Sequence, residues 1–103
     1  MGAITTIVTI HIERASALAE LFKAFSDSSR LRIISALVNH ELNVSAIAKA
    51  VELTESATSH HLRGLRQMRL VRARKEGRQV FYSLLDEHVK ELYQTGLDHV
   101  MHG

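Results

Sequence analysis

The sequence contains no cysteine, which excludes disulfide bonds and thiolate metal ligands. It also lacks proline and tryptophan, and no apolar run approaches the roughly 20 residues that a membrane-spanning helix needs. The remaining composition, 46% hydrophobic and 23% charged residues, is typical of a globular protein. A chain of 103 residues fits one domain. We therefore expect a single cytoplasmic domain over residues 1–103, with no membrane partner.

The net charge of +2 conceals an uneven distribution. The stretch from Leu62 to Val80 carries seven basic side chains and one acidic side chain. The stretch from Asp86 to Gly103 carries four acidic side chains, one lysine and three of the seven histidines. A basic segment followed by an acidic, histidine-rich segment indicates two different binding partners.

Residues 1–12 are uncharged and rich in β-branched side chains, and we expect them to form an N-terminal arm. Hydrophobic periodicity in the rest of the chain predicts a mostly α (α+β) fold. Four helices are expected from apolar spacing and capping residues: 12–25, 28–38 capped by Asp27, 44–51 after Asn43, and 55–68 capped by Thr54. The last two are short and joined by a few residues. Residues 43–68 are therefore typical of a helix-turn-helix.

The periodicity changes after Leu70. Alternation from Val71, a turn at Gly77 and a β-rich run up to Leu84 predict a two-stranded hairpin over residues 71–84. Glycine at the turn supplies a positive φ angle. A final helix is expected from Glu87 to about Met101, with Asp86 as its N-cap.

Side chains able to bind DNA gather on the helix from residue 55 and on the hairpin. Hydroxyl groups can contact phosphates, arginine and glutamine can contact base edges, and a basic hairpin can lie along the phosphate backbone. We predict a recognition helix and an adjacent electrostatic clamp for double-stranded DNA. The predicted contacts are Ser56, Thr58, Ser59, His60, Arg63, Arg66 and Gln67 in the helix, and Arg72, Arg74, Lys75 and Arg78 in the hairpin.

Four candidate metal ligands lie at the two ends of the last helix, over residues 86–102. Asp86 and His88 are at its start, whereas His99 and His102 share one face of its last turn. The two pairs are about 16 Å apart along one helix, too far for a single ion. In a two-fold dimer with antiparallel helices, Asp86 and His88 of one chain would meet His99 and His102 of the other. Each site would then have one oxygen and three nitrogen ligands, a set suited to tetrahedral Zn²⁺. The alternative is that the histidines are merely exposed and Asp86 is only a cap.

From about Ala17 to His102, a combination of motifs resembles the ArsR/SmtB family of metal-responsive winged-helix repressors. The matching stretches are LFKAFSDSSRLR at 21–32, SHHLRGL at 59–65, LV at 70–71, RKEGR at 74–78 and YSL at 82–84. The resemblance implies a homodimeric winged helix-turn-helix whose wing is the hairpin. Asp86, His88, His99 and His102 match the complete ligand set of the zinc-sensing subgroup.

The function implied by the resemblance is repression by the apo dimer on operator DNA. Zn(II) as a regulatory ligand would release the DNA and derepress metal efflux or sequestration genes. We expect His99 to transmit the metal signal, because its second ring nitrogen can bond to the protein body. Asn43 and Ser45 stand where relatives that sense thiophilic metals carry cysteines, so sensing through sulfur is excluded.

Three alternatives remain at this point. The first is a sensor of Ni(II) or Co(II). Octahedral Ni(II) would need further ligands, and His11 in the arm is the only other obvious imidazole. A constitutive DNA-binding regulator would carry the histidines incidentally. A zinc enzyme or zinc-storage protein is disfavoured, because no nucleophile–base pair or glycine-rich phosphate loop is present. We therefore expect no enzymatic activity and no small organic substrate.

Apolar residues of the first and last helices are ambiguous between the core of one chain and a dimer interface. We expect a mixture, with Phe22 and Phe25 in the core. The positions concerned are Leu18, Leu21, Phe22, Leu92, Leu97 and Val100.

Overall fold

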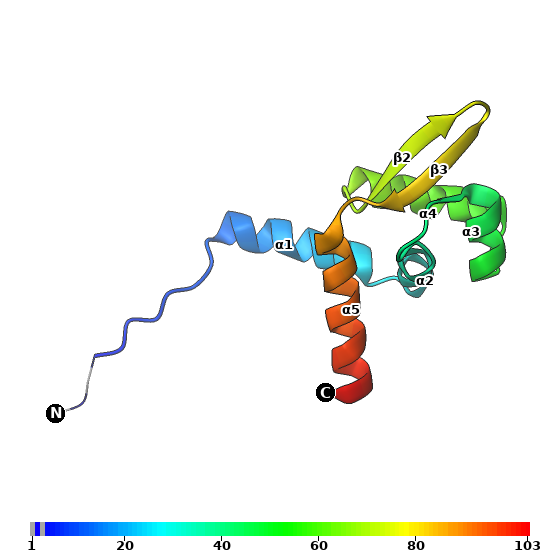
Figure 1. Ribbon diagram of the computed structural model, residues 1–103. Helices are drawn as coiled ribbons and strands as arrows, with labels where there is room; N and C mark the ends of the chain where they lie inside the picture. The colour runs from blue at the N-terminus through cyan, green and yellow to red at the C-terminus, as the bar shows by residue number, and fades with distance from the viewer. Residues whose placement is uncertain (1, 3) are drawn as a thin grey trace.

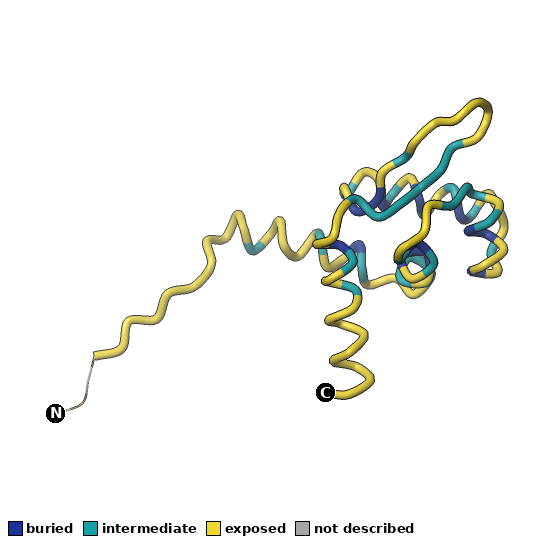
Figure 2. Tube along the Cα trace, viewed as in Figure 1, coloured by how far each residue is buried: buried dark blue, intermediate teal, exposed yellow. Residues whose placement is uncertain are grey.

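A computed structural model describes Gly2 and residues 4–103; Met1 and Ala3 of the predicted arm lie outside the described residues. The arm residues that are described are extended and exposed, and they lead into the first helix (Figures 1 and 2). The elements that follow are α1 (Ile12–Phe25), α2 (Ser28–Ala36), β1 (Leu42–Asn43), α3 (Val44–Val51), α4 (Glu55–Gln67), β2 (Val71–Glu76), β3 (Gln79–Leu84) and α5 (Glu87–His102). Each expected helix and strand is present, with its ends within two residues of the expected positions.

Side-chain caps explain why four of the helices begin where they do. An N-cap oxygen satisfies a backbone N–H that has no partner within the helix. Asp27 Oδ1 accepts from Arg30 N at 3.1 Å, and Asn43 Oδ1 accepts from Ala46 N at 2.9 Å. Thr54 Oγ1 accepts from Ala57 N at 3.0 Å, and Asp86 Oδ1 accepts from Val89 N at 3.2 Å. Asp27, Thr54 and Asp86 are the caps expected from the sequence, and Asn43 lies just before its helix as expected.

The sheet has three antiparallel strands in the order β1-β3-β2. The hairpin of β2 and β3 pairs from Val71 with Leu84 to Glu76 with Gln79, and Gly77 in its turn has φ +60°. Strand β1 was not expected, because two residues are too few to show a period. It pairs only through Leu42 with Tyr82 and Asn43 with Phe81, and thereby joins the hairpin to the start of α3.

The core lies between α2, α3, α4 and the base of the sheet. Its largest fully buried side chains are Ile33, Ile34 and Leu37 from α2 and its C-cap, Ile47 from α3, Thr58, Leu62 and Leu65 from α4, and Val71 from β2. Burying these side chains is the main favourable contribution to folding. In the part of the chain that the structure describes, no helix is long and apolar enough to cross a membrane.

Helices α1 and α5 contribute little to this core. Only Ala24 of α1 and Val89 of α5 are buried, and Figure 2 shows most of both helices exposed. Phe25 is half-buried against the core, but Phe22 is 51% exposed, so the expectation that it belongs to the core is wrong for a single chain. Phe22 instead lines an apolar groove of about 540 Å³ between α1, α2 and α5.

Candidate DNA interface and metal ligands

The turn between α3 and α4 is set by local backbone geometry. Glu52, the C-cap of α3, adopts a left-handed conformation with φ +58°, which turns the chain sharply toward α4. Arg32 Nη1 donates a 2.8 Å hydrogen bond to the carbonyl of Val51 and so satisfies the end of α3. Thr54 then caps α4. The two helices are thereby held as a tight pair, and one face of α4 is exposed to solvent.

The predicted contacts on α4 divide between its two faces. One predicted residue, Thr58, is fully buried, and its Oγ1 has no hydrogen-bond partner among the described residues. Thr58 shares the core face with Leu62 and Leu65, at i, i+4 and i+7, so the expectation that it contacts DNA is wrong. The apolar spacing of those two leucines already carried this signal. Ser59 is half-buried, and the exposed predicted residues are Ser56, His60, Arg63, Arg66 and Gln67.

The cations of the hairpin differ in their surroundings. Lys75 and Arg78 are exposed near its turn, and no ion pair is found for either within the described residues. Arg72 is directly opposite Ser83 in the register, and its Nε donates to the hydroxyl of Ser83 at 3.2 Å. All three side chains belong to the hairpin of β2 and β3, and their contact with a phosphate backbone stays a prediction.

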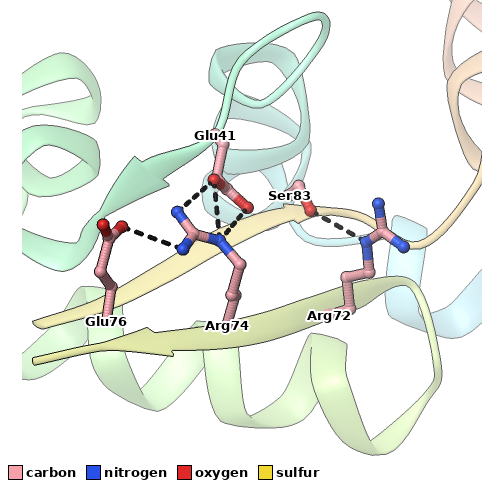
Figure 3. A network of polar contacts seen from close by, with 5 residues as sticks. All are labelled: Glu41, Arg72, Arg74, Glu76 and Ser83. Carbon is pink, nitrogen blue, oxygen red and sulfur yellow. Dashed lines mark hydrogen bonds and ion pairs between the residues drawn. The ribbon is translucent and has the colours of Figure 1, made fainter.

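Arg74 is held by two carboxylates, as Figure 3 shows. Its Nη2 is 2.7 Å and its Nε 3.1 Å from Glu41 Oε1, and its Nη1 is 2.9 Å from Glu76 Oε2. The guanidinium carbon also lies 5.2 Å from the ring centre of Phe81, the cross-strand partner of Arg74. Hydrogen bonds from Arg74 lower the pKa of Glu41, and those from Arg74 to Glu41 and then Glu76 raise the pKa of Arg74. The sequence did not reveal this pair, because 33 residues separate its members.

The predicted metal ligands lie as two separate pairs on α5. Asp86 Oδ2 is 3.6 Å from His88 Nδ1 at the start of the helix, and His99 and His102 are exposed in its last turn. Among the described residues, no three histidine, cysteine, aspartate or glutamate side chains are close enough to hold one ion. His11 serves as the N-cap of α1, where its Nδ1 accepts from Glu13 N at 3.4 Å. A four-ligand site on α5 therefore needs ligands from a second chain.

A three-helix core, a tight helix pair and a cation-bearing hairpin next to the second helix of that pair define a winged helix-turn-helix, a class of DNA-binding domains. Within this class, the chain belongs to the ArsR family of bacterial regulatory proteins. The family described as "Bacterial regulatory protein, arsR family" matches residues 27–73.

Similar proteins extend this assignment over most of the chain. The chain is 49% identical over 89 residues to the transcriptional repressor SmtB homolog of Synechocystis sp., covering 86% of this chain and 67% of that protein. It is 43% identical over 82 residues to a cadmium resistance transcriptional regulatory protein CadC homolog of Staphylococcus aureus, covering 79% and 68%. Among solved structures, the homodimeric winged helix-turn-helix DNA-binding domain of a Mycobacterium bovis protein matches with a TM-score of 0.78 and 28% identity, covering 94% and 96%. The relatives are transcriptional regulators.

Proposed function

We propose that the chain is a cytoplasmic, homodimeric transcriptional repressor that binds operator DNA without metal and releases it when Zn(II) binds. The observation that carries the proposal is the distribution of candidate ligands on α5, with an Asp–His pair at one end and a His–His pair at the other. The names of the SmtB and CadC relatives support a repressor that responds to metal.

Unpartnered apolar surface on α1 and α5 supports a dimer. The groove between these helices and α2 is lined mainly by apolar side chains, and a domain of this size gains stability by covering such a surface. The homodimeric M. bovis domain supports the same arrangement. Exposed residues on these helices that a partner would cover are Leu18, Phe22, Leu92, Leu97 and Val100.

The donor set at the ends of α5 fits a zinc ion shared by two chains. Oδ1 of Asp86 caps the helix, so Oδ2 remains to act as a ligand beside His88. In an antiparallel pair of α5 helices, these groups would meet His99 and His102 of the second copy, which gives two equivalent sites of four protein ligands. Zinc bound there would fix the relative orientation of the two helices. Four protein ligands leave no open position, which suits regulation rather than catalysis.

The DNA-binding surface comprises the exposed face of α4 and the hairpin cations Arg72, Lys75 and Arg78. Two copies would place two α4 helices in successive major grooves, and their separation depends on the dimer geometry. A metal that favours another geometry must weaken DNA binding, and DNA must weaken metal binding by the same factor. We infer that His99 transmits this coupling, since it lies one turn inside the end of α5 and, with one ring nitrogen on the metal, its second ring nitrogen could bond to the protein body.

Fluorescence anisotropy tests this function directly. A labelled duplex spanning two major grooves is selected from a randomised pool by the protein in chelator, and binding is then measured in chelator and in zinc. Salt is held fixed, because phosphate contacts make affinity steeply salt-dependent. Tight binding that weakens in zinc is the expected result. If DNA binding is unaffected by zinc but weakened by Ni(II) or Co(II), the regulatory metal is that ion and not Zn(II). DNA binding unaffected by all three metals would indicate a constitutive regulator.

A further inference from the structure

The segment from Glu41 to Asn43 makes side-chain contacts to the hairpin from the entrance of the helix-turn-helix. It leaves the α2 region at Glu41, forms β1, and ends at Asn43, where α3 begins. The contacts bear on how the hairpin is held when the protein binds DNA, so the inference rests on the DNA-binding function proposed above.

The first contact is the bidentate pair between Glu41 and Arg74. Both carboxylate oxygens accept from the guanidinium, at 2.7 Å, 3.1 Å and 3.2 Å. Two parallel hydrogen bonds fix the orientation of the guanidinium as well as its position. Glu76 also contacts Arg74, but it lies two residues away on the same strand and cannot fix the hairpin to the rest of the domain.

The second contact uses both ends of the Asn43 amide. Its Oδ1 accepts from Ala46 N and caps α3, while its Nδ2 donates to Gln79 Oε1 at 3.0 Å. One side chain therefore joins the first turn of the helix-turn-helix to the start of β3. A shift of the hairpin would break this bond or disturb the cap.

The two contacts lie where backbone support for the hairpin ends. Strand β1 pairs with β3 no further along the hairpin than Asn43 with Phe81, and Phe81 is the cross-strand partner of Arg74. From Lys75 to Val80, the hairpin extends beyond that support as two strands alone. An isolated two-stranded hairpin is at best marginally stable in water. Its direction therefore depends on the side-chain contacts that Glu41 makes with Arg74 and Asn43 makes with Gln79.

We propose that Glu41 is a positioning residue for DNA binding, which holds Arg74 so that the hairpin projects at a fixed angle to α4. Lys75 and Arg78 then contact phosphates, whereas Arg74 serves as an internal anchor and contacts none. Asn43 gives the same hairpin a second point of attachment.

Long-range electrostatics predicts the opposite role for Glu41. A carboxylate beside a cationic DNA-binding surface repels phosphates, so its removal should tighten binding if charge alone decides. Its removal should also free Arg74 for a phosphate. The sign of the change in affinity therefore separates the two roles.

The experiment compares Glu41→Ala with Glu76→Ala, which removes the same charge beside the same arginine but leaves the attachment at Glu41. Binding is measured by anisotropy in chelator on the duplex selected by the wild-type protein, over a range of salt concentrations. We expect E41A to weaken binding by about two- to fivefold, the range that an exposed ion pair supplies. E76A should leave binding unchanged or tighten it. Thermal unfolding midpoints should be similar for all three proteins, so that the change in affinity is not a loss of fold.

Arg74→Gln and Lys75→Gln complete the test through their salt dependence. Each phosphate contact that is lost makes the plot of log affinity against log salt shallower by about 0.9. We expect that change for K75Q, and no change of slope for R74Q despite weaker binding. Tighter binding by E41A, or a slope for R74Q as shallow as that of K75Q, would overturn the proposal.

A readout without DNA separates this inference from the proposed function. The {¹H}-¹⁵N heteronuclear NOE of Gly77 and Arg78 reports motion of the hairpin turn on the picosecond to nanosecond timescale. It should fall in E41A and stay at the wild-type value in E76A. If the wild-type protein bound no DNA but showed this pattern, the DNA-binding function would fail while the attachment stood. Equal NOE values in all three proteins would refute the attachment.

Discussion

The guanidinium of Arg30, in the first turn of α2, lies against the backbone of Gly64 in α4. A Cβ atom on residue 64 would be 2.8 Å from Nη2 of Arg30 and 3.3 Å from its Cζ. Nε of Arg30 is buried without a hydrogen-bond partner among the described residues. A glycine within a helix costs roughly 0.5–1 kcal/mol relative to alanine. Here it provides the space that the arginine occupies between α2 and the recognition helix.

This contact predicts that the effect of Gly64→Ala depends on Arg30. In an Arg30→Ala background, G64A should stabilise the protein by about 1 kcal/mol through helix propensity. In the wild-type background the gain should be smaller, because the guanidinium must move aside. A double-mutant cycle from urea unfolding measures the difference. Equal effects of G64A in the two backgrounds would show that the close approach has no energetic consequence.

Thr58 provides a test of which face of α4 is buried. Replacing it with valine removes a buried hydroxyl that has no hydrogen-bond partner in the described part of the chain, while conserving the shape of the side chain. We expect Thr58→Val to raise the free energy of unfolding by about 1 kcal/mol, since an unsatisfied buried polar group is costly. DNA affinity should be unchanged. Loss of DNA binding at unchanged stability would instead mean that the hydroxyl reaches the nucleic acid.

The sequence predicted the local structure well because its signals are local. Asp27, Asn43, Thr54 and Asp86 each cap a helix through a bond to a residue three positions on, and Gly77 supplies the positive φ of the turn. Such interactions depend on a few adjacent residues. Helix and strand boundaries could therefore be inferred without knowledge of the tertiary fold.

Contacts between segments far apart in the sequence were not predicted. The pairing of β1 with β3 and the contact of Glu41 with Arg74 join residues far apart in the sequence. A charge pattern identifies Arg74 as basic but cannot show that a carboxylate already holds it. Phe22 was misassigned for a related reason, because helical spacing shows which side chains share a face but not what covers that face.

Asp86 combines two roles that substitution can separate. Its Oδ1 caps α5, while Oδ2 lies 3.6 Å from His88 and is a candidate zinc ligand. Asparagine is an equally good N-cap but a poorer ligand for zinc. Asp86→Asn should therefore keep the stability of the apo protein and weaken zinc binding. Asp86→Ala should also weaken zinc binding, and it should lower the free energy of unfolding by about 1 kcal/mol because the cap is lost. Chemical denaturation in chelator and zinc titration check the two effects. Wild-type zinc affinity in D86N would remove Asp86 from the ligand set.

Asp27 predicts part of the acid sensitivity of the fold. The backbone N–H of Arg30 donates to its carboxylate and lowers the pKa of Asp27 below its ordinary value of 3.8. A depressed pKa means that the carboxylate stabilises the fold above pH 3.8, and that this contribution is lost as the pH falls through the folded-state value. Asparagine can cap without titrating. The stability difference between wild type and Asp27→Asn should therefore be constant near neutral pH and change below pH 3.8. Parallel curves of unfolding free energy against pH down to the acid range would contradict this.

The proposed intersubunit zinc site predicts that two variants, each defective in zinc binding, complement each other. Loss of a residue that only hydrogen-bonds to a metal ligand lowers metal affinity by roughly 10–100-fold. His88→Ala and His99→Ala should each lower zinc affinity by more than that, because each removes a proposed ligand itself. His40 is an exposed histidine beyond the end of α2, so His40→Ala is the matched control and should bind zinc normally.

When H88A and H99A subunits are mixed, a heterodimer carries one site with both substitutions and one intact site. Random mixing makes about half of the dimers heterodimers, so about a quarter of the wild-type number of tight sites should return. Zinc competition against a chromophoric chelator counts these sites. If each site were built within one chain, mixing would restore none, and the antiparallel pairing of α5 helices would be wrong.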